Sequence, residues 1–194
     1  MFIQTETTPN PRTLKFLPGV PVTGGGSADF TSLDDARLSS PLAARLLAAD
    51  GVGRVFLADD WLAVTAADPD NWELLKPEIL GLIMDHFLSG QETLIRRADS
   101  ATEDDNNSDS EGAGEDESEV AKQVRELLDL YVRPAVAQDG GDIIFHGFDK
   151  GVVYLHMRGA CAGCPSSTAT LKMGIERLLR HHIADVTEVR AVAG

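Results

Sequence analysis

The sequence predicts an α+β protein made of two small α+β domains, because two stretches of mixed helix and strand character flank one long acidic segment. That segment, residues 98–117, holds no Lys, Arg or aromatic residue, so it buries too little apolar surface to become ordered. We therefore expect a disordered acidic linker over residues 98–117. It joins a first domain at residues 1–97 to a second domain at residues 118–194.

The first domain contains two pairs of predicted strands, and a short turn joins the members of each pair. Residues 2–7 and 13–19 flank the turn sequence Thr-Pro-Asn-Pro. Residues 52–58 and 61–67 flank a turn of two aspartates. These four segments predict the sheet of the first domain.

Two helices are predicted in the same domain. The first covers residues 39–50, because Ser40 is a typical N-cap residue and Pro41 suits the first helical position. Gly51 marks its end. The second covers residues 76–90, and its predicted apolar face consists of Ile79, Leu82, Ile83 and Phe87.

The second domain is predicted to have the order α-β-β-α-β. Its first helix, over residues 118–134, carries apolar residues at helical spacing: Val120, Val124, Leu127, Leu128 and Tyr131. Residues 143–148 and 152–158 are predicted strands, followed by a helix over residues 165–182 and a last strand over residues 186–192. The apolar face of the second helix consists of Leu171, Ile175, Leu178 and Leu179.

The chain has two cysteines, Cys161 and Cys164, and they lie where a predicted strand gives way to a predicted helix. Pro165 suits the first helical position, so Cys164 is expected at the N-cap or beside it. Unpaired backbone N–H groups and the helix dipole favour negative charge there. Because the thiolate is the form that binds metal or attacks a disulfide, the pair is a candidate functional site.

One interpretation of the pair is a thiol–disulfide oxidoreductase of the thioredoxin kind, whose C-x-x-C motif also opens a helix. In this sequence a helix and a hairpin precede the motif in place of the expected βαβ unit. No later proline of the domain is available to face the pair. Two inert, small buried residues are a further interpretation.

A second functional interpretation is a zinc site completed by histidines, which needs four ligands. His181 and His182 lie at the far end of the predicted helix, about 25 Å from the sulfurs. His146 and His156 fall in predicted strands, where we expect them on the sheet surface. One chain therefore does not visibly supply a zinc ligand set.

A third interpretation is an iron–sulfur cluster, which usually takes four cysteine thiolates. One chain offers two thiolates, and two chains related by a two-fold axis offer four. Such a pair of subunits could hold a [4Fe–4S] cluster between them, with two helix N-termini facing its negative charge. A site shared across an interface opens easily, which suits delivery of a cluster better than permanent storage.

Two stretches of the sequence resemble a known family. "RPAVAQDGGDI" followed by "GVVYLHMRGACAGCPSSTATLKMGIERLL" strongly resembles the NifU C-terminal-like domain of Nfu-type iron–sulfur carriers. "MFIQTETTPNPRTLKFLPG" resembles the Nfu N-terminal domain. Together the two domains cover nearly the whole chain apart from the linker.

The resemblance implies a carrier without enzymatic activity that receives a [4Fe–4S] cluster from an upstream assembly scaffold and passes it to apo-proteins. By the family pattern, the cluster ligands fall on Cys161 and Cys164. The implied partners are apo iron–sulfur clients, the upstream scaffold and a second copy of the chain. A thiol–disulfide oxidoreductase that uses Cys161 and Cys164 is the alternative.

Composition limits the other classes of partner. The formal net charge is −14 and there is no basic stripe, so we expect no nucleic-acid partner. No apolar run approaches the length of a membrane span, so we expect no membrane partner. The first residues resemble neither a secretion signal nor a transit peptide. A bacterial cytoplasmic protein is the simplest expectation, and a processed organellar form is the alternative.

Outside the cysteine pair, the sequence "DGGD" predicts a turn with a structural role. Gly140 and Gly141 suggest backbone angles that are costly for other residues, and Asp139 and Asp142 are expected to cap or close the turn. The first domain has no cysteine, and its one histidine, His86, is expected on a helix surface or in the core. We therefore expect the first domain to serve recognition of clients.

Overall fold

The computed structural model describes residues 2–95, 119–162 and 165–192, without the side chains of residues 165–168. The chain divides into two compact units, Met1–Asn106 and Asn107–Gly194. Each unit combines helices with a sheet, so the predicted α+β class is confirmed. The predicted linker lies outside the described residues.

The N-terminal unit is built on a five-stranded sheet with the order β1-β2-β5-β4-β3, in which all neighbouring strands are antiparallel. Its strands are β1 (Gln4–Thr7), β2 (Thr13–Leu17), β3 (Ala28–Phe30), β4 (Val52–Leu57) and β5 (Leu62–Ala66). The four predicted strands are confirmed. Strand β3 was not predicted, because its three residues are too short to show an alternating pattern.

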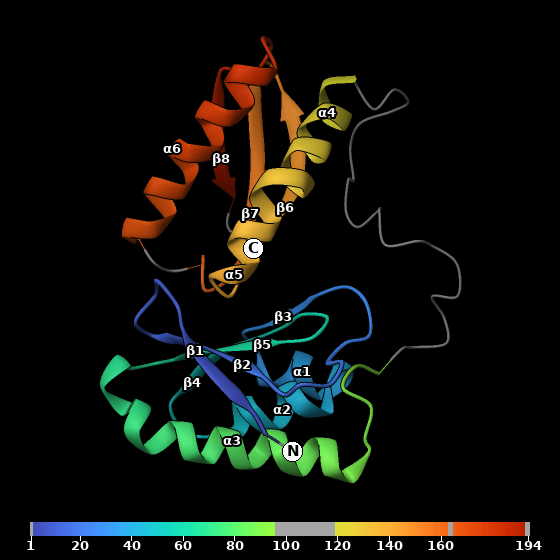
Figure 1. Cartoon of the computed structure of the whole chain (residues 1–194), viewed down its shortest axis with the longest axis vertical. Coiled ribbons are helices and arrows are strands. Elements are labelled where there is room, and N and C mark those ends of the chain that lie inside the picture. The colour runs from blue at the N-terminus through green and yellow to red at the C-terminus, as the bar shows by residue number, and fades with distance from the viewer. Residues whose placement is uncertain (1, 96–118, 163–164, 193–194) are drawn as a thin grey trace. The chain divides into compact units, whose positions relative to one another are not determined.

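The helices of this unit lie on one face of that sheet (Figure 1). They are α1 (Leu33–Ser39), α2 (Pro41–Ala48) and α3 (Trp72–Ser89), with a 3₁₀ turn η1 (Pro69–Asn71) before α3. The core between helices and sheet includes Phe16, Leu42, Leu46, Leu57, Leu62, Ile79 and Ile83, all fully buried. The unit therefore has a core of its own.

The helix ends of this unit follow the sequence in part. Ser40 caps α2 as predicted, and its Oγ accepts a hydrogen bond from the Ala43 N–H at 3.1 Å. The predicted start of the last helix at residue 76 is wrong, because η1 leads directly into α3 and Pro77 lies inside the helix. Helix α1 was missed, although Ser32 at its N-cap is a recognisable start signal.

The C-terminal unit has the predicted α-β-β-α-β order. Its elements are α4 (Glu119–Leu127), a π-helical turn η3 (Leu128–Val132), α5 (Arg133–Gln138), β6 (Gly141–Asp149), β7 (Val152–Gly159), α6 (Pro165–His182) and β8 (Glu188–Val192). Strand β7 pairs with β6 in antiparallel and with β8 in parallel orientation. The helices lie on one face of this sheet (Figure 1), over a core that includes Val124, Leu128, Ile143, Leu155, Ile175, Leu179 and Val189.

The first helix of this unit differs from the prediction in length and in the face that it buries. It continues beyond residue 134 to Gln138 through the π turn. Tyr131 is 55% exposed, so its predicted place on the apolar face is wrong, whereas Val132 and Val136 are buried. The buried positions Val124, Leu128, Val132 and Val136 are four residues apart. In a continuous α-helix, with 3.6 residues per turn, residues at this spacing would rotate gradually away from the core. The wider π turn offsets this rotation, so all four side chains face the core.

Within the described ranges, no helix is both long enough and apolar enough to cross a membrane.

Candidate functional site

Cys161 lies in the loop between β7 and α6, four residues before the helix begins at Pro165. It is 8% exposed and packs with the apolar core of the C-terminal unit. Cys164 lies outside the described residues, and so does its predicted place at the N-cap of α6. Cys161 therefore lies between a strand and a helix, as the sequence predicts.

The backbone of Gly141 lies directly against the Cys161 side chain. A β-carbon built on Gly141 would lie 2.5 Å from the Cys161 Sγ and 3.1 Å from the Arg158 carbonyl oxygen. Real β-carbons do not approach other atoms so closely, so only glycine fits there without displacing the sulfur. Strand β6 therefore begins with a residue that makes room for Cys161.

The preceding residue, Gly140, is a glycine for a different reason. Its φ of +75° lies in the left-handed region, which ends α5 and turns the chain into β6. Its carbonyl oxygen accepts a hydrogen bond from the Ala160 N–H at 2.9 Å, beside Cys161. The predicted structural role of both glycines is confirmed, but only Gly140 needs a special backbone angle.

The two aspartates of the "DGGD" sequence have separate roles. Asp139 is exposed and takes the C-cap position of α5. Asp142 is 7% exposed and forms a two-pronged ion pair with Arg133, with Nε–Oδ1 at 3.0 Å and Nη2–Oδ2 at 3.2 Å. The prediction that Asp142 caps or closes the turn is therefore wrong, because its carboxylate joins β6 to the start of α5.

Arg133 is the residue near the site that sequence reasoning missed. It stands at the start of the quoted stretch "RPAVAQDGGDI", but no local spacing rule links it to a carboxylate nine residues later. Its guanidinium also donates to Asp129 Oδ1 at 3.1 Å. The hydrogen bonds to Asp142 raise the pKa of Arg133 above its ordinary value.

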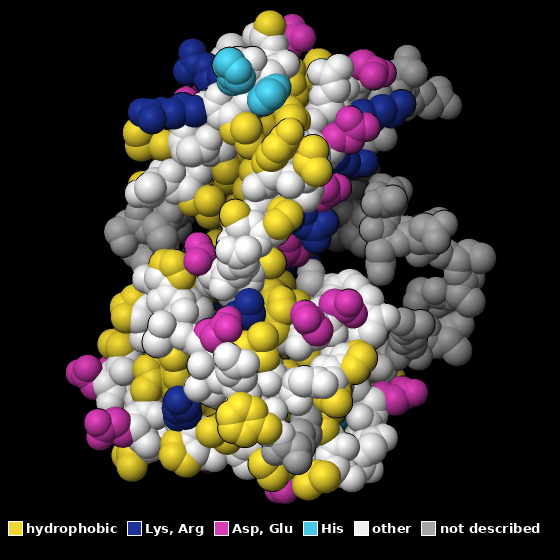
Figure 2. Space-filling model, in the orientation of Figure 1, with side chains coloured by type: hydrophobic (Ala, Val, Ile, Leu, Met, Phe, Trp, Pro, Cys, Tyr) yellow, Lys and Arg dark blue, Asp and Glu magenta, His cyan; other side chains and the backbone are white. Residues whose placement is uncertain are grey.

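Two histidines of the C-terminal unit lie far from the cysteine loop, and the other two lie in the strands of its sheet. Helix α6 is continuous, so His181 and His182 stand at its far end, where the His182 ring stacks on Tyr131 at 6.4 Å. In Figure 2 histidine side chains gather at that end of the unit, beside hydrophobic side chains. His146 is exposed in β6, and His156 is half-buried in β7. Among the described residues, no group of three or more His, Cys, Asp or Glu could hold a metal ion.

The histidine of the N-terminal unit belongs to the core, in agreement with one of the two predicted places. His86 on α3 is fully buried, and its Nε2 lies 3.3 Å from Thr93 Oγ1. Its Nδ1 has no hydrogen-bond partner among the described residues. Burial, and after it the positive charge of Arg45, lowers the pKa of His86 below 6.5.

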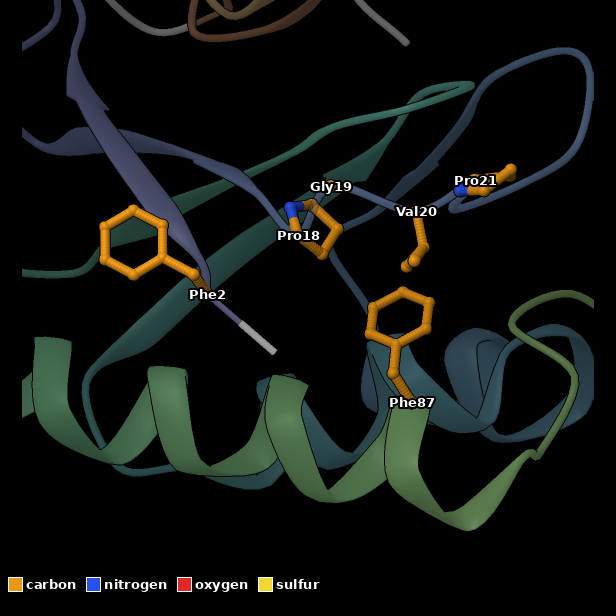
Figure 3. Close-up of a pocket in the computed structure, with 6 residues that line it drawn as sticks. All are labelled: Phe2, Pro18, Gly19, Val20, Pro21 and Phe87. Carbon is orange, nitrogen blue, oxygen red and sulfur yellow. The ribbon is translucent and has the colours of Figure 1, made fainter.

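An open apolar hollow of about 550 Å³ lies on the N-terminal unit, between the start of the chain, the loop after β2 and the end of α3. Phe2, Pro18, Gly19, Val20, Pro21 and Phe87 line it (Figure 3). The ring of Phe87 points from α3 towards Val20. Phe2 is 84% exposed, so the hollow is open to solvent.

Both units match known families. The family model described as "NifU-like domain" matches residues 124–190, and the one described as "Scaffold protein Nfu/NifU N terminal" matches residues 3–90. Together the two matches span more than half of the chain. The chain belongs to the Nfu/NifU family. The resemblance that the sequence motifs indicate is thereby confirmed.

Several relatives within the Nfu/NifU family match almost the whole chain. "NifU-like protein 4, mitochondrial" and "NifU-like protein 5, mitochondrial", both of Arabidopsis thaliana, are 48% and 47% identical over 97% of this chain. "NFU1 iron-sulfur cluster scaffold homolog, mitochondrial" of Drosophila willistoni is 45% identical over 99% of it. The chain spans between 64% and 67% of the length of these relatives.

A solution structure of a NifU-like protein from Saccharomyces cerevisiae is 29% identical to this Nfu/NifU chain. The matched region covers 50% of this chain and 87% of the yeast chain. The TM-score is 0.44, which is too low to bear on the fold.

Proposed function

We propose that this chain is an iron–sulfur carrier that holds a [4Fe–4S] cluster between two copies of itself and delivers it to apo-proteins. The cluster is cargo, and its ligands are Cys161 and Cys164 of each copy. The observation that carries the proposal is the C-x-x-C pair of a NifU-like domain at the entry to α6, with Cys161 seated against Gly141. The relative from Drosophila willistoni is named an iron–sulfur cluster scaffold homolog, which supports the same class of function.

The number of thiolates supports a site that two subunits share. A [4Fe–4S] cluster usually takes four cysteine ligands, and this chain has two cysteines. A two-fold axis brings together two C-x-x-C loops and the N-termini of two α6 helices, whose partial positive charges favour a negatively charged cluster. Delivery to a client then exchanges the four iron–thiolate bonds of Cys161 and Cys164 for bonds to the client's own ligands, and no bond within the chain breaks.

The positions of His86, His181 and His182 argue against a ligand role for these three histidines. His181 and His182 stand about 25 Å from the start of α6, because the helix rises about 1.5 Å per residue over its whole length. His86 belongs to the core of the other unit. The proposal therefore assigns no ligand role to these three histidines.

The N-terminal unit is proposed to recognise apo clients and the upstream scaffold. It has its own core, so it can form a stable surface for docking. It has no cysteine, so it is not proposed to bind the cluster. A tether to the C-terminal unit raises the effective concentration of the cluster at a docked client without new contacts. No catalytic step is assigned to the chain.

Anaerobic reconstitution with ferrous iron and sulfide tests this function against a thiol–disulfide oxidoreductase. The proposal predicts a brown protein with about four irons and four sulfides per two chains. It also predicts transfer of that cluster to an apo-acceptor such as apo-aconitase. A colourless product whose two thiols oxidise reversibly and reduce insulin disulfides would favour the oxidoreductase and contradict the proposal.

The place of action is proposed from the relatives. The Arabidopsis and Drosophila proteins are named mitochondrial, which agrees with the organellar alternative. These names give no support to a bacterial cytoplasmic protein. Imaging of the chain with a fluorescent tag at its C-terminus, expressed from the full gene in its own cells, would decide between the two.

A further inference from the structure

We propose that the ion pair between Arg133 and Asp142 is a positioning element for Cys161, which acts through the backbone of Gly141. The inference rests on the proposed role of Cys161 as a cluster ligand. Neither charged residue is a ligand of the cargo in the proposed function. Their effect is to hold β6 where the cysteine needs it.

The ion pair between Arg133 and Asp142 is held at two points. Asp142 accepts from the Arg133 Nε at 3.0 Å and from Nη2 at 3.2 Å, so both carboxylate oxygens face one planar guanidinium. Asp142 Oδ1 also accepts from the Ile143 N–H at 2.8 Å. The Asp142 side chain is 10% exposed and that of Arg133 is 45% exposed, so the constraint on position comes from the two-pronged geometry rather than from burial of both charges.

Asp142 is linked to the Cys161 sulfur through the neighbouring Gly141. Asp142 directly follows Gly141, whose backbone lies so close to Cys161 that a β-carbon there would reach within 2.5 Å of the Sγ. Gly141 pairs with Gly159 and Asp142 pairs with Arg158 across the β6–β7 ladder. A shift of β6 at Asp142 would therefore move the surface on which the Cys161 side chain rests.

The restraint on β6 originates in helix α5. Arg133 is the first residue of α5, directly after the π turn, and also contacts Asp129 at 3.1 Å. Asp129 is 61% exposed, so that contact is a surface pair and contributes little. The buried partner Asp142 thus transmits the position of the helix to the strand, and Asp129 serves as a matched control.

The test measures the reactivity of the Cys161 thiol in the apo full-length chain. Replacement Cys164→Ser leaves Cys161 as the only thiol, and its rate of alkylation by iodoacetamide is followed at fixed pH under native conditions. Asp142→Asn keeps the shape of the side chain and the acceptor for Ile143 but removes the charge. We expect alkylation of Cys161 to become several-fold faster in Asp142→Asn and in Arg133→Gln.

Two comparisons separate positioning from general loss of stability. The double variant Arg133→Gln/Asp142→Asn should react no faster than either single variant, because both remove the same interaction. Arg133→Lys, which keeps the charge but not the planar fork, should react at an intermediate rate. Asp129→Asn, and Ile183→Val in the core beyond the far end of α6, should leave the rate unchanged.

The outcomes are distinct from those of the proposed function. Wild-type rates in Asp142→Asn and Arg133→Gln, additive rates in the double variant, or an equal increase in Ile183→Val would each overturn this inference. A wild-type chain that binds no cluster would overturn the proposed function, while the thiol rates would still decide the positioning role. With both correct, Asp142→Asn should also lose its reconstituted cluster faster than Asp129→Asn, as followed by visible absorption.

Discussion

Gly141 and Cys161 are twenty residues apart in sequence and in contact in space: a β-carbon on Gly141 would stand 2.5 Å from the Cys161 Sγ. The absence of a side chain at the first residue of β6 is therefore a condition for the place of the thiol. This contact joins the "DGGD" turn to the C-x-x-C loop. It also explains why two consecutive glycines occur there although only Gly140 has a positive φ.

We predict that Gly141→Ala displaces Cys161. The added methyl group overpacks the contact, which should lower the free energy of unfolding of the C-terminal unit by about 1–3 kcal/mol. The variant should also retain less cluster after reconstitution. Gly147→Ala in the same strand is the matched control, because a β-carbon there meets no atom within 4 Å. Equal urea midpoints and equal iron content for the two variants would refute the contact.

Both cysteines are predicted to be required, without rescue by a histidine. Cys161→Ser and Cys164→Ser should each abolish a stable bridged cluster, because a two-fold site loses two of its four thiolates at once. His181→Ala and His156→Ala should keep the wild-type iron content. A single-cysteine variant that holds a full [4Fe–4S] cluster by iron analysis and electron paramagnetic resonance would rule out this ligand set.

His86 predicts a pH dependence of the stability of the N-terminal unit. Its pKa in the folded unit lies below the value of 6.5, so the unfolded chain binds a proton first as pH falls. The contribution of His86 to the free energy of unfolding is therefore fully present above about pH 6.5. Below that pH the free energy of unfolding decreases by at most about 1.4 kcal/mol per pH unit, until the pH reaches the pKa of His86 in the folded unit. Urea unfolding between pH 7.5 and about pH 5 measures this slope.

His86→Gln isolates the contribution of that histidine. Glutamine can still reach Thr93 with a hydrogen bond but does not titrate, so the difference between wild type and variant should grow as pH falls. Carboxylates titrate equally in both proteins and cancel in the difference. A difference that stays constant from pH 7.5 to about pH 5 would show that the burial of His86 has no effect on its proton affinity.

The isolated C-terminal unit, residues 118–194, is predicted to bind and transfer a cluster. Its core is formed from its own helices and sheet, and both cysteines belong to it. Loss of the N-terminal unit should slow transfer to natural clients more than transfer to a permissive acceptor, because the tether no longer raises the local concentration. Transfer rates that are unchanged for all clients would refute the recognition role.

Regular elements with a clear period could be predicted from the sequence, and local irregularities could not. The predicted bounds of helix α6 agree with the observed ones, because Pro165 suits its first position and apolar residues repeat at helical spacing from Leu171 to Leu179. Tyr131 was assigned to a buried face because its distance of seven residues from Val124 fits an α-helix. The π turn rotates Tyr131 out of the buried face. No residue type in the turn is a sequence signal for a wider helical turn.

The candidate site was predictable to the extent that it is local. The C-x-x-C spacing and the following proline indicated the loop and the helix start. The contact of Gly141 with Cys161 and the ion pair of Arg133 with Asp142 are tertiary, because they depend on how α5 and β6 pack against β7. The sequence therefore predicts a turn role for Asp142, whereas its carboxylate pairs with Arg133 on the preceding helix.

Native mass spectrometry of the anaerobically reconstituted full-length chain tests the central claim most directly, because it counts chains, irons and sulfides in one species. The account predicts a dominant ion with the mass of two chains plus four irons and four sulfides. It predicts that Cys161→Ser yields only single chains without iron. A single chain that carries a complete cluster, or two chains joined without iron and sulfide, would contradict a cluster bridged by Cys161 and Cys164 of both copies.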